Sequence, residues 1–189
     1  MSQTPCCPRP RPLPRQTSRG LTMVELLCCL CISGLLLAGA LPSLRDLRLR
    51  QTLDAVAAML ETDVQYARSL ARATDRTVRL AVQATADGGS CYVIHSGPAG
   101  ACSCDASGAA RCDEPAQLQR VQVQAATAGV RISTASRSLV FDAGKGTVTP
   151  TATFVVTDSE GRALHQIVNV LGRTRSCSPS GLAGYRRCA

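Results

Sequence analysis

The pattern of hydrophobic and polar positions changes twice along the chain. Residues 21–41 form an apolar run with a single charged residue, Glu25. As a helix, this run would extend about 31 Å at ~1.5 Å per residue, which is enough to cross the hydrocarbon core of a membrane. Apolar residues then recur at spacings of three and four until about Ala73, which predicts a continuing amphipathic helix. Beyond this helix the period becomes two, which predicts strands.

Seven segments carry the strand pattern: residues 77–82, 91–95, 120–123, 130–133, 138–141, 153–156 and 164–170. Residues 97–115 are rich in Gly, Ala, Ser and Cys, so we expect a loop there that disulfides hold in place. One long helix packed on an antiparallel sheet gives an α+β fold. We expect the polar positions of the amphipathic helix, such as Asp46, Asp63 and Arg68, to face solvent.

The cysteines indicate an oxidising compartment, because eleven are too many for a small cytosolic protein without metals. Cys6 and Cys7 precede the apolar run and three more lie within it. The other six are Cys91, Cys102, Cys104, Cys112, Cys177 and Cys188. This even number predicts three disulfides, and six cysteines allow 15 pairings. We expect Cys177 to pair with Cys188, and the other four to pair among themselves.

A zinc site is the alternative use of these six cysteines. The Cys102-Ser103-Cys104 spacing is shorter than the usual gap between zinc ligands, and export of the protein also opposes zinc. We therefore predict no metal site and no cofactor.

Positive charge is concentrated at the two ends of the chain. Four arginines precede Gly20 with no acid among them, so their removal would lower the formal charge from +8 to +4. The last 28 residues contain no Asp or Glu and five arginines: Arg162, Arg173, Arg175, Arg186 and Arg187. We call the last four of these the C-terminal arginines. Their concentration in one segment indicates an anionic partner.

The arginines before the apolar run predict that the N-terminus stays in the cytoplasm and the C-terminal part crosses the membrane. A cleaved secretory signal peptide is the simplest alternative, since Ala38-Gly39-Ala40 is similar to its cleavage site. Two features oppose it. Glu25 inside the apolar run costs about 2.5–3.5 kcal/mol on insertion scales, and the helical pattern continues past residue 40.

Residues 19–26, Arg-Gly-Leu-Thr-Met-Val-Glu-Leu, resemble the prepilin signature of type IV pilins and type II secretion pseudopilins. The resemblance implies that a membrane peptidase cleaves after Gly20 and methylates Leu21, and that Glu25 is the glutamate at the fifth mature position. Pro42 stands where many pilins also have a proline, whereas Leu21 replaces the usual phenylalanine. In a filament, Glu25 would pair with the α-amino group of Leu21 in a neighbouring subunit, which would fix the axial register.

The order of segments in the second half resembles the FimT/GspH group of minor pilins and pseudopilins. The resemblance rests on residues 138–141, the turn from Gly144 to Pro150, a strand containing Phe154, and residues 164–175. In the FimT branch a Gly-Arg-x-Arg motif is implicated in binding DNA during natural transformation, and Gly172-Arg173-Thr174-Arg175 matches it. Arg186 and Arg187 are added to the predicted DNA-binding residues on their charge alone.

No catalytic site is predicted. Residues 142–147 are similar to a phosphate-binding loop, but Leu139 and Gly146 replace required residues and a strand follows, so we expect a hairpin turn. His95 and His165 lie within strand patterns and are expected to be structural. Oxidised cysteines would not act as nucleophiles. The protein is therefore not expected to be an enzyme.

These observations predict three regions: a prepilin leader over residues 1–20, a transmembrane and assembly helix over 21–44, and a periplasmic α+β pilin head over 45–189. We expect a single-pass inner-membrane protein whose partners are other pilins, the prepilin peptidase and double-stranded DNA. The resemblance implies a minor pilin for DNA uptake. The alternative is a type II secretion pseudopilin, or a minor pilin that primes pilus assembly, with no DNA role.

Overall fold

The computed structural model describes residues 20–105 and 107–188, without the side chains of residues 40–42. The chain divides into two units between Ser43 and Leu44. The first unit contains the apolar run, and the predicted leader lies outside the described residues except for Gly20. The second unit, which we call the head, contains the amphipathic part of the helix and all the strands.

The apolar run and the amphipathic stripe belong to one helix, α1 (Met23–Thr74). Thr22 caps its start, because Glu25 N donates a hydrogen bond to Thr22 Oγ1 over 3.2 Å. The helix ends where Asp75 adopts a positive φ of 51° and Arg76 N donates to Ala71 O. Among the described residues, α1 is the one helix that is long and apolar enough to cross a membrane.

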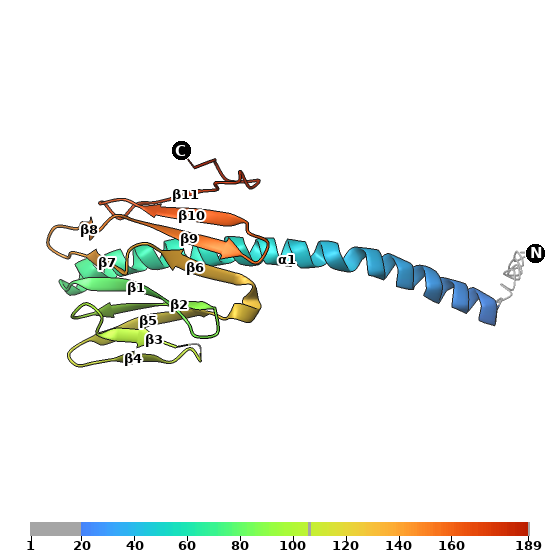
Figure 1. The fold of residues 1–189 in the computed structure, drawn as a ribbon, viewed down its shortest axis with the longest axis horizontal. Coiled ribbons are helices and arrows are strands. Elements are labelled where there is room, and N and C mark those ends of the chain that lie inside the picture. Colours follow the sequence, from blue (N-terminus) through green and yellow to red (C-terminus); the bar gives the residue numbers. More distant parts are fainter. Residues whose placement is uncertain (1–19, 106, 189) are drawn as a thin grey trace, which may run out of the picture. The chain divides into compact units, whose positions relative to one another are not determined.

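Two antiparallel sheets of the head contribute to one core with α1 (Figure 1). The first sheet has the order β5-β2-β1-β7-β8. Its strands are β1 (Val78–Ala84), β2 (Ser90–Ser96), β5 (Gln117–Gln124), β7 (Ser138–Phe141) and β8 (Val148–Thr149). The second sheet has the order β11-β10-β9-β6. Its strands are β6 (Val130–Thr134), β9 (Ala152–Asp158), β10 (Ala163–Val168) and β11 (Thr174–Cys177). A single 3₁₀ turn (Ala126–Ala128) precedes β6. This arrangement confirms the predicted α+β fold of a long helix and antiparallel sheets.

The core forms where the apolar stripe of α1 meets the inward-facing residues of both sheets. Leu53, Leu60 and Val64 of α1 are fully or almost fully buried. They belong to the same cluster as Phe141 of the first sheet and Phe154 of the second. With only two phenylalanines and no tryptophan, the core is packed mainly from Val, Leu, Ile and Ala.

The predicted loop over residues 97–115 contains a third, two-stranded sheet instead. Strands β3 (Cys102–Cys104) and β4 (Ala110–Cys112) pair as an antiparallel hairpin. The Cys102–Cys112 disulfide joins the two strands, and the Cys91–Cys104 disulfide ties the hairpin to β2. The sequence-based prediction of a loop is therefore wrong for these residues, although disulfides do hold the segment in place.

Asp63 was expected to face solvent, but it is 0% exposed and lies between α1 and the first sheet. The expectation is therefore wrong. Tyr92 Oη donates a hydrogen bond to Asp63 Oδ2 over 2.8 Å, and Arg120 forms an ion pair with Asp63 Oδ1. The guanidinium of Arg120 also lies 4.4 Å from the ring centre of Tyr66. Two partners on different strands therefore compensate the burial of one charged helix residue.

The buried hydroxyl of Tyr92 is expected to make the stability of the head depend on pH under alkaline conditions. Burial, followed by the hydrogen bond and the negative charge of Asp63, raises the pKa of Tyr92 far above its usual value of 10.0. The unfolded tyrosine ionises near pH ~10, so this contribution to stability is present below pH ~10 and is lost as pH rises further. The free energy of unfolding should therefore fall less between about pH 9 and about pH 11 in Tyr92→Phe than in the parent protein. Equal slopes in denaturant titrations at these pH values would contradict this role.

Candidate functional site

The turn between β10 and β11 carries Arg173 on a rigid backbone. Asn169 Oδ1 accepts hydrogen bonds from Leu171 N over 3.0 Å and Arg173 N over 2.9 Å. Gly172 N donates to Asn169 O over 2.8 Å, and Asn169 N donates to Arg173 O over 3.1 Å. Gly172 adopts a φ of 69°, a conformation that favours glycine. These hydrogen bonds fix the backbone of the turn, and the Arg173 side chain is exposed.

Arg175 lies on β11, the edge strand of the second sheet. Its register partner on β10 is Ile167, which is 40% exposed, so both side chains belong to the outer face of the sheet. The neighbouring residue Ser176 is on the opposite face, where Ser176 Oγ donates to Gln166 Oε1 over 2.9 Å. Because successive side chains of a strand point to opposite faces, Arg175 points to solvent.

The segment after β11 is closed by a disulfide between Cys177 and Cys188, the pair expected from the sequence. Within it, Ser178 N donates to Arg186 O over 2.9 Å and Cys188 N donates to Ser178 O over 3.2 Å. Ser178 Oγ also donates to Ala163 O over 3.2 Å, which joins the loop to β10. These contacts bring Arg186 and Arg187 back beside the end of β11.

Tyr185 anchors the same loop to the helix. Its ring packs on the edge of the core cluster. Burial, followed by a hydrogen bond to the Asp54 carboxylate of α1, raises the pKa of Tyr185. This position makes Tyr185 a structural residue of the loop.

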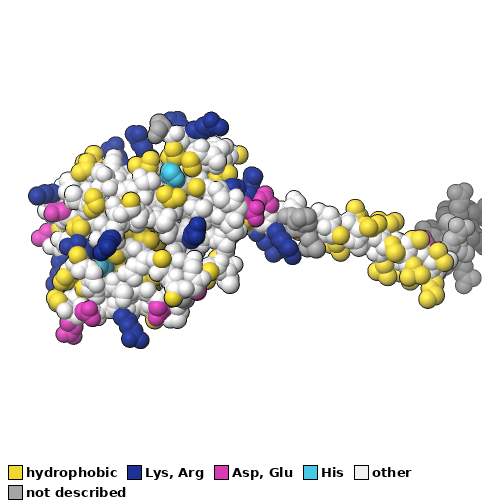
Figure 2. Space-filling model, in the orientation of Figure 1, with side chains coloured by type: hydrophobic (Ala, Val, Ile, Leu, Met, Phe, Trp, Pro, Cys, Tyr) yellow, Lys and Arg dark blue, Asp and Glu magenta, His cyan; other side chains and the backbone are white. Residues whose placement is uncertain are grey.

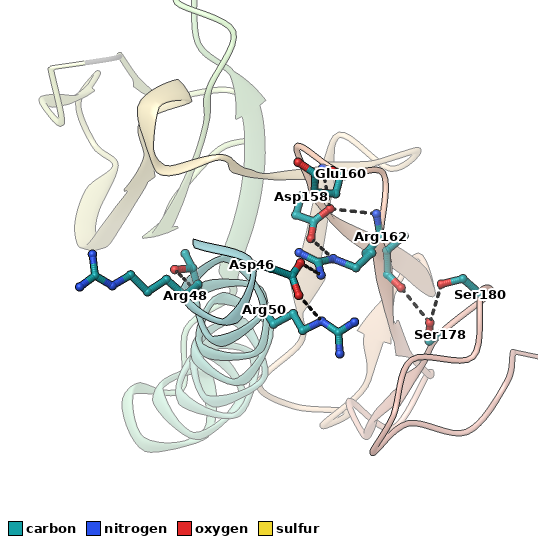
Figure 3. Close-up of polar contacts among 10 residues, drawn as sticks. Asp46, Arg48, Arg50, Asp158, Glu160, Arg162, Ser178 and Ser180 are labelled. Carbon is teal, nitrogen blue, oxygen red and sulfur yellow. Dashed lines mark hydrogen bonds and ion pairs between the residues drawn. The ribbon is translucent and has the colours of Figure 1, made fainter. Parts of the chain in front are cut away.

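Arg162 does not contribute to the exposed positive charge, although it belongs to the basic C-terminal segment. Its Nε donates to Asp158 Oδ2 over 2.5 Å, and its Nη1 pairs with Asp46 Oδ1 over 2.5 Å (Figure 3). Asp46 also pairs with Arg50 on the next turn of α1. The Arg162 side chain is only 13% exposed, so it ties the β9–β10 turn to the helix. Asp46 is exposed, as expected from the sequence, but its carboxylate also pairs with two arginines.

The C-terminal arginines differ from Arg162 in exposure and in pairing. All four are exposed. Within residues 20–105 and 107–188, the ion pairs involve Arg50, Arg120 and Arg162 but none of the C-terminal arginines. Figure 2 shows Lys and Arg side chains gathered over the part of the head where Figure 1 draws β11 and the C-terminal segment. This edge presents positive charge that no carboxylate neutralises in the described chain.

The two histidines lie within strands β2 and β10, as the sequence pattern predicted. His95 is fully buried in β2, and burial lowers its pKa, which favours the neutral ring. His165 lies close to Cys177 and Cys188, with ligand atoms within 4.8 Å of one another. Because these two sulfurs form a disulfide, they are not thiolates that bind a metal.

The N-terminal residues of the prepilin signature lie at the start of α1. Leu21 and Glu25 are exposed in the chain on its own, and Glu25 is in the first turn of the helix. The cap by Thr22 was missed by the sequence analysis. Its signal is the Thr22-Met23-Val24-Glu25 spacing, in which a threonine precedes a glutamate by three residues before an apolar run.

Comparison with known protein families shows to which family the chain belongs. A family model described as type II transport protein GspH matches residues 56–172. The matched segment runs from the buried part of α1 to the glycine that precedes Arg173, and covers more than half of the chain. The chain belongs to the GspH family. No curated protein and no solved structure matches it significantly.

Membership of the GspH family confirms the resemblance to FimT/GspH-type minor pilins. It supports the role of a minor pilin or pseudopilin that interacts with other pilins or pseudopilins, which are structural proteins. The apolar helix near the N-terminus is consistent with a single-pass inner-membrane pilin. Both the prepilin signature and the C-terminal arginines lie outside the matched residues, so their roles are matters for proposal.

Proposed function

We propose that this GspH-family protein is a minor type IV pilin that binds double-stranded DNA at the pilus during DNA uptake for natural transformation. The observation that carries the proposal is the set of C-terminal arginines, which are exposed and have no carboxylate partner among the described residues. Two of them stand on the Asn169-organised turn and its strand, and two on the disulfide-closed loop beside that strand.

The chemistry of these side chains favours phosphate over other anions. The planar guanidinium of arginine donates paired hydrogen bonds to phosphate oxygens, and its charge releases the counterions that surround DNA. Backbone contacts carry little sequence information. Binding should therefore be nearly independent of sequence and strongly weakened by salt.

The N-terminal part of the proposal concerns processing and assembly. Residues 1–20 act as a prepilin leader, and the prepilin peptidase cleaves between Gly20 and Leu21 and methylates the Leu21 amine. Residues 21–44 anchor the protein in the inner membrane and later in a filament, where Glu25 pairs with the amine of a neighbouring subunit. Residues 45–189 face the periplasm.

A second function is favoured by the family match itself, whose description refers to type II transport and whose residues end before Arg173. In that case the protein is a pseudopilin of type II secretion, or primes pilus assembly, and does not bind DNA. Deletion of the gene distinguishes the two functions. The first function requires a loss of transformation while filaments still form, whereas the second requires a loss of secretion or of filaments.

Replacing Arg173 and Arg175 together by glutamine should weaken binding to duplex DNA by roughly tenfold or more at low salt. Two fewer phosphate contacts should also reduce the slope of log K against log salt by up to about two units. The measurement is a fluorescence anisotropy titration of labelled duplex DNA at several salt concentrations. The protein is the chain from Leu21 onward in an uncharged detergent, because the arginines of the leader would bind DNA themselves.

The matched control removes the same charge from another edge of the head. Arg131 lies on β6, at the edge of the second sheet opposite β11, and Arg137 precedes β7; both are exposed. The Arg131→Gln, Arg137→Gln variant should keep most of the affinity. If it loses as much as Arg173→Gln, Arg175→Gln, or if the latter binds like the parent protein, the assignment of the site is wrong.

A further inference from the structure

We propose that Arg68 and Arg72 of α1 extend the DNA-binding surface into a groove along the helix, where they hold the phosphate backbone beside Arg173. This inference rests on the proposed function and adds two binding residues to it. Neither arginine belongs to the Gly-Arg-x-Arg sequence, and the amphipathic pattern alone assigns Arg68 to a solvated face.

The groove runs over the last turns of α1. Its lining consists of Gln65, Arg68, Ser69, Arg72 and Ala73. Arg68 and Arg72 are four residues apart, so they are neighbours on one face of the helix. Two guanidinium groups therefore line a single shallow depression of the surface.

The β10–β11 turn lies directly against Arg68. A Cβ added to Gly172 would stand 3.0 Å from Arg68 Cδ and 3.0 Å from Val148 Cγ2. Gln65 Nε2 donates to Gly172 O over 3.1 Å, which fixes the turn against the helix. The glycine before Arg173 thus leaves room for the Arg68 stem to cross the turn, and places Arg68 next to the proposed DNA-binding residue.

A second glycine turn lies against Arg72 in the same way. A Cβ on Gly146, in the turn between β7 and β8, would stand 2.8 Å from Arg72 Nη2. Val148 N donates to Val170 O over 2.7 Å, so this turn is bonded to the one that carries Arg173. Two turns that are distant from α1 in sequence therefore converge on the two helix arginines.

The charge at this place is not neutralised within the described part of the chain. No ion pair among the described residues involves Arg68 or Arg72. Arg68 Nε is buried against the β10–β11 turn and has no hydrogen-bond partner among the described residues, so the Nη atoms of Arg68 are the donors available to an anion in the groove. The β7–β8 turn adds Lys145 as well as Asp142, whose carboxylate accepts a hydrogen bond from Lys145 N over 2.8 Å. An anion with several acceptor oxygens, such as a phosphate chain, fits such a set of donors.

The test compares variants in the DNA titration described above, with the chain from Leu21 onward. Arg68→Gln with Arg72→Gln should weaken duplex binding by roughly tenfold and reduce the salt slope by up to about two units. Arg68→Lys with Arg72→Lys keeps both charges and the aliphatic stems, so the salt slope should stay near that of the parent protein. Thermal melting shows whether each variant is folded.

The outcomes separate this inference from the proposed function. If Arg173→Gln, Arg175→Gln loses affinity while Arg68→Gln, Arg72→Gln binds like the parent protein, the groove is not part of the site and the proposed function stands. If both glutamine variants lose affinity while the Arg131→Gln, Arg137→Gln control does not, the groove is supported. If the parent protein does not bind duplex DNA, both proposals are overturned.

Discussion

Replacing Glu25 by alanine is expected to leave membrane insertion and leader cleavage intact and to reduce incorporation into filaments by more than about tenfold. A charged residue in an apolar helix costs about 2.5–3.5 kcal/mol on insertion scales, and a glutamate without a partner does not recover this cost. We therefore expect Glu25 to have a partner in the assembled filament, and alanine would remove that contact. In a filament of packed helices, a neighbouring α-amino group at Leu21 would compensate that charge and fix the register between subunits. The measurement is the ratio of filament-bound to membrane-bound protein.

A matched variant separates the charge of Glu25 from its place at the helix start. Thr22→Ala removes the hydroxyl that accepts the hydrogen bond from Glu25 N and so weakens the cap, but it keeps the carboxylate. We expect Thr22→Ala to assemble nearly normally. Filaments that contain Glu25→Ala at the parent level would show that the carboxylate has no part in assembly.

Replacing Arg120 by glutamine is expected to lower the free energy of unfolding of the head by about 3 kcal/mol. Asp63 is fully buried, and Arg120 supplies the positive charge that compensates it. Without Arg120, the carboxylate keeps the hydroxyl of Tyr92 as its side-chain partner and remains an uncompensated buried charge. Chemical denaturation followed by circular dichroism measures the loss.

The double variant Asp63→Asn, Arg120→Gln tests this explanation. Removing both charges should cost less than the sum of the two single variants, because no buried charge is left without a partner. The exposed Arg131, replaced by glutamine, should change stability by less than about 0.5 kcal/mol. Additive losses in the double variant would contradict an ion pair between these residues.

The strong periodic segments of the sequence predicted most of the fold. The stripe along α1 was expected to end near Ala73, and the helix ends at Thr74. The expected strand over residues 138–141 matches β7, and the other predicted strands overlap observed ones. These elements bury one face against a shared core, so their apolar positions follow the helical or strand period.

The strands that the sequence did not predict lack that signal. Strands β3 and β4 have three residues each, and disulfides hold them where apolar residues are few. Strand β8 has two residues, and β11 has four, of which only Cys177 is buried. Strands without an alternating apolar pattern are defined by their partners in the sheet, and no local pattern specifies a partner.

Partners that are distant in sequence also explain which polar residues were misplaced by the sequence pattern. Asp63 has the helix position of a surface residue, and its burial depends on Arg120, 57 positions away. Arg162 was counted in the positive charge of the last 28 residues, but its partner Asp46 lies 116 positions away on α1. The Cys177–Cys188 pairing was easier to predict, because these two cysteines lie far along the chain from the other four of the head.

The mature N-terminus is the central claim on which the pilin account depends. Intact-mass and N-terminal analysis of the membrane-bound protein measures it directly. The account predicts a chain that begins at Leu21, carries one added methyl group on its amine and retains Glu25. A product that begins at Leu41, after the Ala38-Gly39-Ala40 triplet, would have lost Glu25 and the apolar run and would contradict the account.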